Sequence, residues 1–161
     1  MSKHDPQNPR IVLQQDHRHV AALLDRLIAC VRADDREATS ACFSRVEKAL
    51  LKHLDVEEMF VFPVLVKTHA KEVDALLREH AVLRRDLGAI GLDLDLHMVR
   101  EKAIEAFCAT LREHAEREEA LAYAQAEQRL PASVAKSIVS RIARAARRKL
   151  RTPGIVARVA S

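Results

Sequence analysis

Histidine and glutamate residues recur along this chain at spacings that suit a metal site. One order occurs twice: a single histidine, then a second histidine with a glutamate four residues after it. The residues of the set are His17, His53, Glu57, His80, His114 and Glu118. Residues four apart on a helix lie on nearly the same face, so each His-x-x-x-Glu would direct an imidazole and a carboxylate into one cavity. Each pair continues into a second glutamate, which makes the repeat His-x-x-x-Glu-Glu.

The two carboxylates indicate what this set would bind. A carboxylate in an apolar core is costly unless a cation balances it or a proton neutralises it. Two metal ions would balance both, and mixed nitrogen and oxygen ligands suit iron, manganese or zinc. Glu57 and Glu118 come from opposite halves and are expected to bridge the ions, while the two histidines of each half complete one ion. Six ligands leave room for water, an oxo or hydroxo bridge, or a small diatomic guest.

Four helical patterns position these residues. In each pattern apolar residues recur at steps of three and four, and the histidine falls on the same stripe. The stripes are Leu13, His17, Val20, Leu24, Leu27 and Val31; Cys42, Val46, Ala49, His53, Val56 and Phe60; Val73, Leu76, His80, Leu83, Leu87 and Ile90; and Ile104, Phe107, Leu111, His114, Glu118 and Leu121. Short connections make successive helices antiparallel. We therefore expect an all-α, up-down-up-down antiparallel four-helix bundle in which the set meets at one level.

Two local signals mark the expected helix boundaries. Asp34 with Glu37 resembles a capping box ahead of the second helix. Gly88 and Gly91 mark the expected end of the third.

Composition supports helices and an intracellular setting. Of the 161 residues 48% are hydrophobic but only 3% are aromatic, and glycine occurs three times. This balance disfavours a β-sandwich or barrel. The start of the chain is polar and no apolar run is long enough to span a membrane, so we expect a cytoplasmic protein. Cys30, Cys42 and Cys108 are odd in number and far apart, so we expect reduced thiols that are mostly buried.

Charge divides the chain into a body and a tail. Eight Lys and Arg and no acid follow Pro131, which leaves 19 bases against 23 acids before it. Apolar residues line one side of the tail, at Val134, Ile138, Ile142, Ala145 or Ala146, and Leu150. We therefore expect a polar segment (1–10), the bundle (11–130), and an additional C-terminal basic amphipathic helix and tail (131–161). Residues 132–151 would contact the bundle, another protomer, nucleic acid or an anionic membrane.

The set resembles the hemerythrin-like, or HHE cation-binding, family over about residues 11–126. The matching pieces are Asp16-His17, His53-Leu-Asp-Val-Glu57-Glu58 with Phe62-Pro63, Glu79-His80 with Leu83, and His114-Ala-Glu-Arg-Glu118-Glu119. The resemblance implies a four-helix bundle with a non-haem di-iron centre, histidines as terminal ligands and two bridging carboxylates. It carries over, residue by residue, to the six residues of the set.

The chain departs from the oxygen-carrying members of that family. Those proteins have a second histidine one turn from the third-helix ligand, where this chain has Leu76 and Arg84. This departure argues against reversible oxygen transport. The proline expected after the second acidic pair is also missing, since Leu-Ala-Tyr-Ala occupies 121–124. The six-ligand set is more similar to bacterial members associated with oxidative or nitrosative stress, iron handling or peroxide decomposition.

We therefore expect a di-iron protein that binds, senses or reduces oxygen, nitric oxide or peroxide. An enzymatic role would be peroxide decomposition, as in a catalase or peroxidase, or repair of iron centres. The alternative is a metal-free helical scaffold whose basic C-terminal helix binds DNA or an anionic membrane. Ferritin-like Glu-x-x-His pairs are absent, because no acid lies three residues before any histidine of the set.

Residues beside the set have weaker expected roles. We expect a charged exterior from Asp16, Glu58, Glu79, Glu116 and Glu119. Of these, Glu58 or Glu119 is also placed to orient a ligand. Tyr123 either lines the site or covers its end.

Overall fold

The computed structural model describes residues 8–149, and within them every side chain except those of 126–127 and 143–149. The long helices are α1 (Pro9–Arg32), α2 (Arg36–Val56), α4 (Ala70–Asp95), α5 (Glu101–Glu118) and α7 (Ala132–Lys149). The shorter ones are α3 (Phe62–Leu65), α6 (Ala124–Arg129) and two π-helical segments, η1 (Glu57–Val61) and η2 (Glu119–Tyr123). No strand occurs in residues 8–149. The expected all-α class is confirmed.

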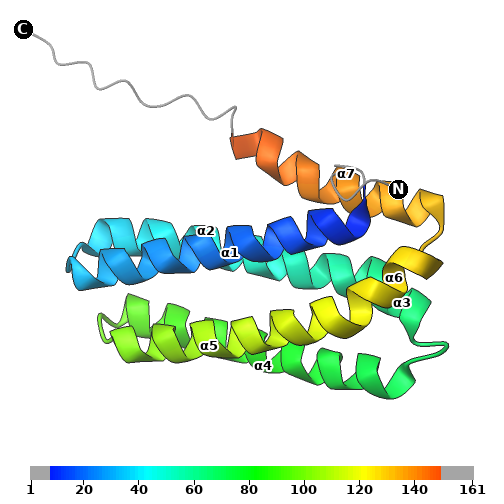
Figure 1. The fold of residues 1–161 in the computed structure, drawn as a ribbon. Coiled ribbons are helices and arrows are strands. Elements are labelled where there is room, and N and C mark those ends of the chain that lie inside the picture. Colours follow the sequence, from blue (N-terminus) through cyan, green and yellow to red (C-terminus); the bar gives the residue numbers. More distant parts are fainter. Residues whose placement is uncertain (1–7, 150–161) are drawn as a thin grey trace, which may run out of the picture.

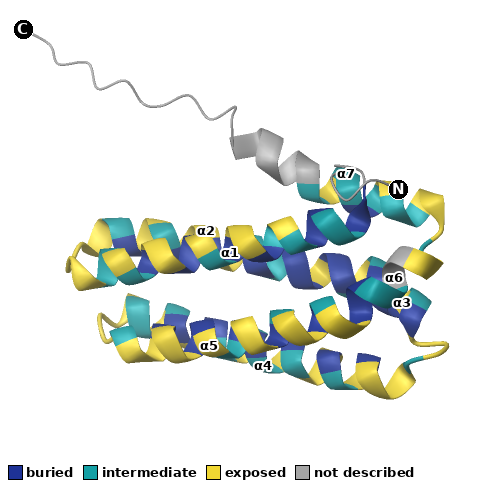
Figure 2. Ribbon diagram, viewed as in Figure 1, coloured by how far each residue is buried: buried dark blue, intermediate teal, exposed yellow. Residues whose placement is uncertain are grey.

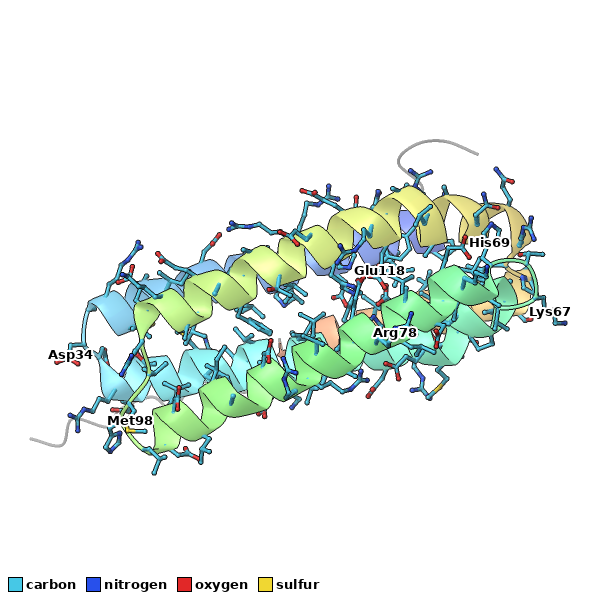
Figure 3. The ribbon with its side chains drawn as sticks, turned by 90° about the horizontal axis from the view of Figure 1, so that it is seen from below. Asp34, Lys67, His69, Arg78, Met98 and Glu118 are labelled. Carbon is cyan, nitrogen blue, oxygen red and sulfur yellow. The ribbon has the colours of Figure 1, made fainter. Side chains whose placement is uncertain are left out.

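The long helices form a bundle. α1 packs against α2 and α5, and α4 packs against α5 and α2 (Figure 1). The α1–α2 and α4–α5 turns, marked by Asp34 and Met98, lie at one end of the bundle (Figure 3). Lys67 and His69, in the connection from α3 to α4, lie at the other end. Consecutive long helices of this group therefore alternate in direction.

Two apolar clusters fill the interior. The larger lies between α1, α2, α4 and α5 and includes Leu27, Leu50, Leu83 and Ile104. The smaller lies toward η1, η2 and α7 and is built from Leu13, Val56, Val61, Phe62, Leu65, Val73, Leu76, Ala122, Tyr123 and Ile138. Buried residues face inward along all four helices (Figure 2). On α1, α4 and α5 the histidine of the predicted site lies between the two clusters in sequence, and on α2 His53 lies just before Leu54, the last residue of the larger cluster there, and Val56, the first of the smaller. The fold therefore encloses the histidines between apolar layers.

The start of α2 differs from the predicted capping box by one residue. Asp35 is the cap, and its side chain accepts a hydrogen bond from the Ala38 amide at 2.9 Å. Asp34 instead has a positive φ of 52° and makes the turn. Such a backbone conformation is uncommon outside glycine, but Asp adopts it more readily than most residues. The prediction that Asp34 caps the helix is therefore wrong.

Gly88 and Gly91 do not end the third long helix, because α4 continues to Asp95. Gly91 has a packing reason instead: a Cβ there would lie 3.1 Å from the ring of Phe43 on α2. The glycine therefore permits close approach of α2 to α4. The prediction that these glycines end the helix is therefore wrong, and Gly91 is instead a residue of the contact between two helices.

The last helix, α7, lies across α1, α2 and η1 (Figure 1). Ile138 is fully buried against the bundle. The guanidinium of Arg141 lies 5.3 Å from the ring centroid of Phe60, and the Lys52 ammonium donates to the Ile142 carbonyl at 3.3 Å. The predicted apolar position Leu150, the end of the tail and residues 1–7 lie outside the described residues. Within the described chain, no helix combines the length and apolar character needed to cross a membrane.

Candidate metal centre

The structure brings the six predicted ligand residues together in the interior of the bundle. His17 is 8% exposed and the other five are at most 1% exposed. Figure 3 shows Glu118 between the helices. Two groups of ligand atoms form, each within a span of 4.8 Å. One group is His17, His53, Glu57 and Glu118, and the other is Glu57, His80, His114 and Glu118. The two glutamates belong to both groups.

The Nε2 atoms of the imidazoles face these shared carboxylates. His53 Nε2 lies 3.4 Å from Glu57 Oε1, and His114 Nε2 lies 3.2 Å from Glu118 Oε2. Both pairs belong to a His-x-x-x-Glu motif on one helical face. His17 Nε2 reaches Glu118 Oε2 across the bundle at 3.3 Å. His80 Nε2 lies 3.3 Å from Glu118 Oε1 and 3.5 Å from Glu57 Oε2, so it contacts both halves.

The Nδ1 atoms face outward, and each one meets a carboxylate from a different helix. The four pairs are His53 with Asp16 at 3.1 Å, His80 with Glu58 at 2.8 Å, His114 with Glu79 at 2.8 Å, and His17 with Glu119 at 3.2 Å. Every one of these acids is the immediate neighbour in sequence of a predicted ligand. A carboxylate on Nδ1 fixes the ring and leaves Nε2 as the metal-binding nitrogen.

These outer carboxylates form a closed circuit around the bundle. The acid beside the ligand of α1 contacts the histidine of α2, and the acid of η1 contacts the histidine of α4. The acid of α4 contacts the histidine of α5, and the acid of η2 returns to the histidine of α1. We call Asp16, Glu58, Glu79 and Glu119 the carboxylate ring. An orienting role was predicted for Glu58 or Glu119 only, and Asp16 and Glu79 were predicted to lie on the exterior. The position of these two acids directly before His17 and His80 is the sequence signal that indicates their contact with the site.

Cationic and amide side chains hold the carboxylate ring in place. Arg84 donates to Glu58 at 2.7 Å, and Arg117 lies 3.1 Å from Glu79. Gln14 donates to Glu119 at 3.0 Å. Arg84 is one of the two residues found where oxygen carriers have a further histidine, and the other, Leu76, is buried in the smaller apolar cluster. Neither residue joins the ligand groups, so the structure keeps the six-residue set.

The π-helical segments explain two further contacts. Phe62 and Tyr123 are each the fifth residue after a shared glutamate. In a regular α-helix that spacing points away from the glutamate, but a π turn pairs residue i with i+5. The Phe62 ring accordingly lies 5.1 Å from the ring of His80, and the Tyr123 ring lies 5.5 Å from that of His17. The second segment forms without the proline that follows Phe62 in the first.

Tyr123 lines the site, which settles the alternatives left by its sequence position. It is fully buried, and its hydroxyl donates a hydrogen bond to Glu57 Oε1. The hydroxyl oxygen of Tyr123 also lies 3.2 Å from His17 Nε2. Burial, together with the adjacent carboxylates of Glu57 and Glu118, raises the pKa of Tyr123 well above its usual value. The phenol therefore keeps its proton and acts as a donor.

The chemistry of the inner atoms fits metal ions. Four buried side-chain atoms have no hydrogen-bond partner among the described residues: His53 Nε2, Glu57 Oε2, His114 Nε2 and Glu118 Oε2. Some of them lie close to one another but are not aligned as hydrogen bonds. An unsatisfied buried polar group costs about 1–3 kcal/mol. All four are atoms that nitrogen and oxygen ligands offer to iron, manganese or zinc.

The electrostatics point the same way. Burial alone would raise the pKa of Glu118, but the imidazoles of His114, His17 and His80 hold it well below its usual range. Burial alone would lower the pKa of His53, but Glu57 and Asp16 raise it well above its usual value. The cluster therefore favours positive charge beside its carboxylates. Bound cations would supply that charge and displace the protons.

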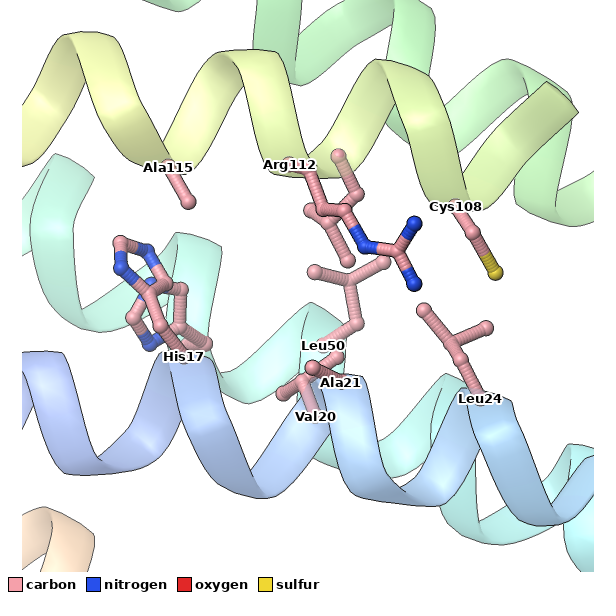
Figure 4. A pocket seen from close by; sticks show the side chains of 10 residues that line it. His17, Val20, Ala21, Leu24, Leu50, Cys108, Arg112 and Ala115 are labelled. Atoms are coloured by element: carbon pink, nitrogen blue, oxygen red, sulfur yellow. The ribbon is translucent and has the colours of Figure 1, made fainter. Parts of the chain in front are cut away.

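An apolar cavity of about 40 Å³ opens next to the centre, between α1 and α5. His17 lies at one end of it, and Leu24 and Cys108 lie at the other (Figure 4). Apart from His17, His53 and Arg112, its lining is apolar or a thiol: Val20, Ala21, Leu24, Leu50, Cys108, Leu111 and Ala115. A space of this size holds a very small molecule. Its lining favours an uncharged one.

Comparison with known families agrees with these observations. A model described as the hemerythrin HHE cation binding domain matches residues 8–126. The chain therefore belongs to this family, as the sequence motifs predicted. No curated protein and no solved structure matches the chain. The family and the His/Glu cluster together indicate a metal-binding helical protein.

Proposed function

We propose that this protein holds two iron ions and uses them to bind, sense or reduce a small uncharged oxidant such as oxygen, nitric oxide or peroxide. Residues 11–130 would be the metal-binding unit, an up-down-up-down four-helix bundle, and residues 131–161 a basic amphipathic addition to it. A role in oxidative or nitrosative stress, or in iron handling, follows from that chemistry. Manganese and zinc fit the same donor atoms.

One observation carries the proposal: Glu57 and Glu118 belong to both groups of ligand atoms. A carboxylate shared by two groups of ligand atoms is placed to bridge two ions. His17 and His53 would complete one ion, and His80 and His114 the other. Six protein ligands for two ions leave positions open for a guest.

Two iron ions would supply electrons and Lewis acidity to a bound oxidant. The chain's own residues do the remaining work. Its carboxylate ring holds each imidazole with Nε2 inward. The apolar walls of the cavity beside His17 exclude charged solutes and offer a small oxidant a place to dwell. Tyr123 keeps its proton on the phenol oxygen and donates it in a hydrogen bond to Glu57.

The first test is metal content per chain, measured by elemental mass spectrometry after purification and after anaerobic iron loading. About two ions per chain are expected, with charge-transfer bands in the near-ultraviolet and visible spectrum. Glu57→Ala and Glu118→Ala should each lose metal because each removes a bridge, whereas Glu116→Ala, an exposed acid on the same helix as Glu118, should not. Retention of two ions in both bridge variants would refute the bridging assignment.

The competing scaffold function makes opposite predictions. If the chain is a metal-free scaffold that binds DNA or anionic membranes through 132–151, removing 131–161 should abolish binding and replacing His53 and His114 should not matter. The burial of Ile138 and the contact of Arg141 with Phe60 favour packing on the bundle over a free binding helix. Absence of metal even after iron loading would favour the scaffold.

A further inference from the structure

Two cysteines meet at the end of the bundle away from the candidate metal centre. The Sγ atoms of Cys30 on α1 and Cys42 on α2 lie 3.3 Å apart. Both side chains are partly exposed, whereas Cys108 on α5 is buried. No sequence motif pairs these two cysteines, because they are twelve residues apart and belong to no CxxC motif. The fold therefore creates a thiol pair between cysteines that are separated in the sequence.

The local fold brings these two cysteines together. Only residues 33–35 connect α1 to α2, so the ends of the helices run antiparallel in close contact. Asp35 caps α2, as described above. On the other side Arg32 donates to Glu101 at 2.6 Å and to Glu105 at 3.1 Å, which ties the end of α1 to α5. The two sulfurs are thus held in contact by a tight, anchored turn.

We propose that Cys30 and Cys42 form a second oxidant-reactive site, a dithiol that hydrogen peroxide converts to an intramolecular disulfide. The thirteen residues from His17 to Cys30 along α1 correspond to roughly 20 Å at about 1.5 Å per residue. Both cysteines are also partly exposed, so peroxide can reach them from solvent without passing through the metal centre. Disulfides of this kind in reducing compartments are transient and respond to oxidants.

The reaction balances with peroxide as the oxidant. One thiol loses its proton, and its thiolate attacks one oxygen of the peroxide. The O–O bond breaks, the departing hydroxide takes up that proton and leaves as water, and a sulfenic acid remains on the sulfur. The second thiol then attacks that sulfur. An S–S bond forms, the S–O bond breaks, and a second molecule of water leaves. Two thiols are oxidised by two electrons in total, and one peroxide is reduced to two waters.

The groups around the two cysteines influence the rate at which peroxide oxidises them. Hydrogen bonding with Cys42, with some help from burial and Asp35, raises the pKa of Cys30, and Arg45 opposes the rise only in part. A smaller thiolate fraction slows attack on peroxide. We therefore expect oxidation when peroxide is in excess over the chain, with the dithiol persisting otherwise.

The test is a thiol count on the full chain after treatment with excess hydrogen peroxide, followed by denaturation. The count should fall from the three cysteines of the sequence to one, and mass spectrometry should find the peptides of Cys30 and Cys42 joined. Dithiothreitol should restore all three. Cys108→Ser should still form the bond and fall from two thiols to none, whereas Cys30→Ser and Cys42→Ser should form no disulfide within the chain, and in each the remaining cysteine of the pair should stay a thiol or stop at sulfenic acid.

Three results would overturn the proposal. The first is a count of three thiols after excess peroxide. The second is a disulfide between chains, or one that includes Cys108. The third is sulfinic acid on either cysteine without a crosslink. The experiment should be run on both chelator-treated and iron-loaded protein. Failure to bind metal would leave the disulfide result unaffected, while oxidation seen only in the loaded protein would refute a separate site.

Discussion

Phe62 and Tyr123 are equivalent residues of the internal repeat, and they differ by one hydroxyl. Each follows a shared glutamate by five residues, lies at or just beyond the end of a π-helical segment, and contacts a histidine ring of the site. Only Tyr123 donates a hydrogen bond, and its acceptor is the glutamate of the other half, Glu57. The two halves of the centre therefore share a backbone plan but differ in hydrogen bonding.

Replacing Tyr123 with Phe should make the two halves more alike. The variant leaves a buried oxygen of Glu57 with one donor fewer, which costs about 1–3 kcal/mol in the metal-free protein. Denaturant unfolding measures that loss. Iron-loaded Tyr123→Phe should keep its metal but show a shifted absorption spectrum, because the orientation of Glu57 is no longer fixed by the phenol. Loss of metal instead would mean that the hydroxyl is required for binding. The matched variant Phe62→Tyr should not reproduce the shift.

Removing one member of the carboxylate ring should weaken metal binding. Glu79→Gln removes the negative charge that faces His114 Nδ1, and with it the ion pair between Glu79 and Arg117. Changes of this kind typically cost 10–100-fold in metal affinity. Competition with a chelator of known affinity measures the change. Glu116→Gln, on the exposed side of the same bundle, should leave affinity unchanged, and equal affinity in the two variants would show that the ring does not support the ligands.

Filling the cavity should slow the arrival of a guest. Ala21 lines the cavity one turn after His17, while its neighbour Ala22 is exposed. Ala21→Leu places additional methyl groups in a space of about 40 Å³. Stopped-flow binding of nitric oxide to the reduced, iron-loaded protein should become slower in Ala21→Leu and stay the same in Ala22→Leu. Equal rates in the wild type and both variants would place the access route elsewhere.

The two glycines of α4 should respond differently to alanine. A Cβ at Gly88 would meet nothing within 4 Å, so Gly88→Ala should stabilise the protein by roughly 0.5–1 kcal/mol, the usual gain in a helix interior. At Gly91 the same gain is opposed by the Phe43 ring at 3.1 Å. Thermal or denaturant unfolding should therefore rank Gly88→Ala above Gly91→Ala. The reverse order would contradict the close packing of α2 and α4.

Periodicity and repetition were sufficient to predict the four long helices of the bundle and the six residues that meet inside it. The apolar stripes predicted which face of each helix is buried, and the His-x-x-x-Glu repeat identified the residues that meet. Sequence patterns failed where three-dimensional contacts decide. Gly91 looked like a helix end because its neighbour Phe43 is distant in the chain, and Cys30 with Cys42 looked unrelated for the same reason.

The π-helical segments account for a different kind of failure. A pattern based on 3.6 residues per turn places Phe62 and Tyr123 off the face of the shared glutamates. Local widening of the helix returns them to the site, and π-bulges of this kind are frequent at functional sites. The carboxylate ring was only partly predicted because single exposed acids are common on helices. What distinguishes Asp16 and Glu79 is the imidazole that each one meets on another helix.

The closed circuit of the carboxylate ring has a consequence for how the protein assembles. Each imidazole is oriented by an acid from the preceding helix in the circuit, so no pair of helices in isolation holds all of the proposed ligands in place. Ion capture and docking of all four helices should then form one cooperative unit, since a site that is absent from the unfolded chain converts binding energy into folding energy. If the proposed metal ions are bound, chelation should consequently lower the melting temperature of the whole bundle, and partial loss of a single helix should release the bound metal as one unit.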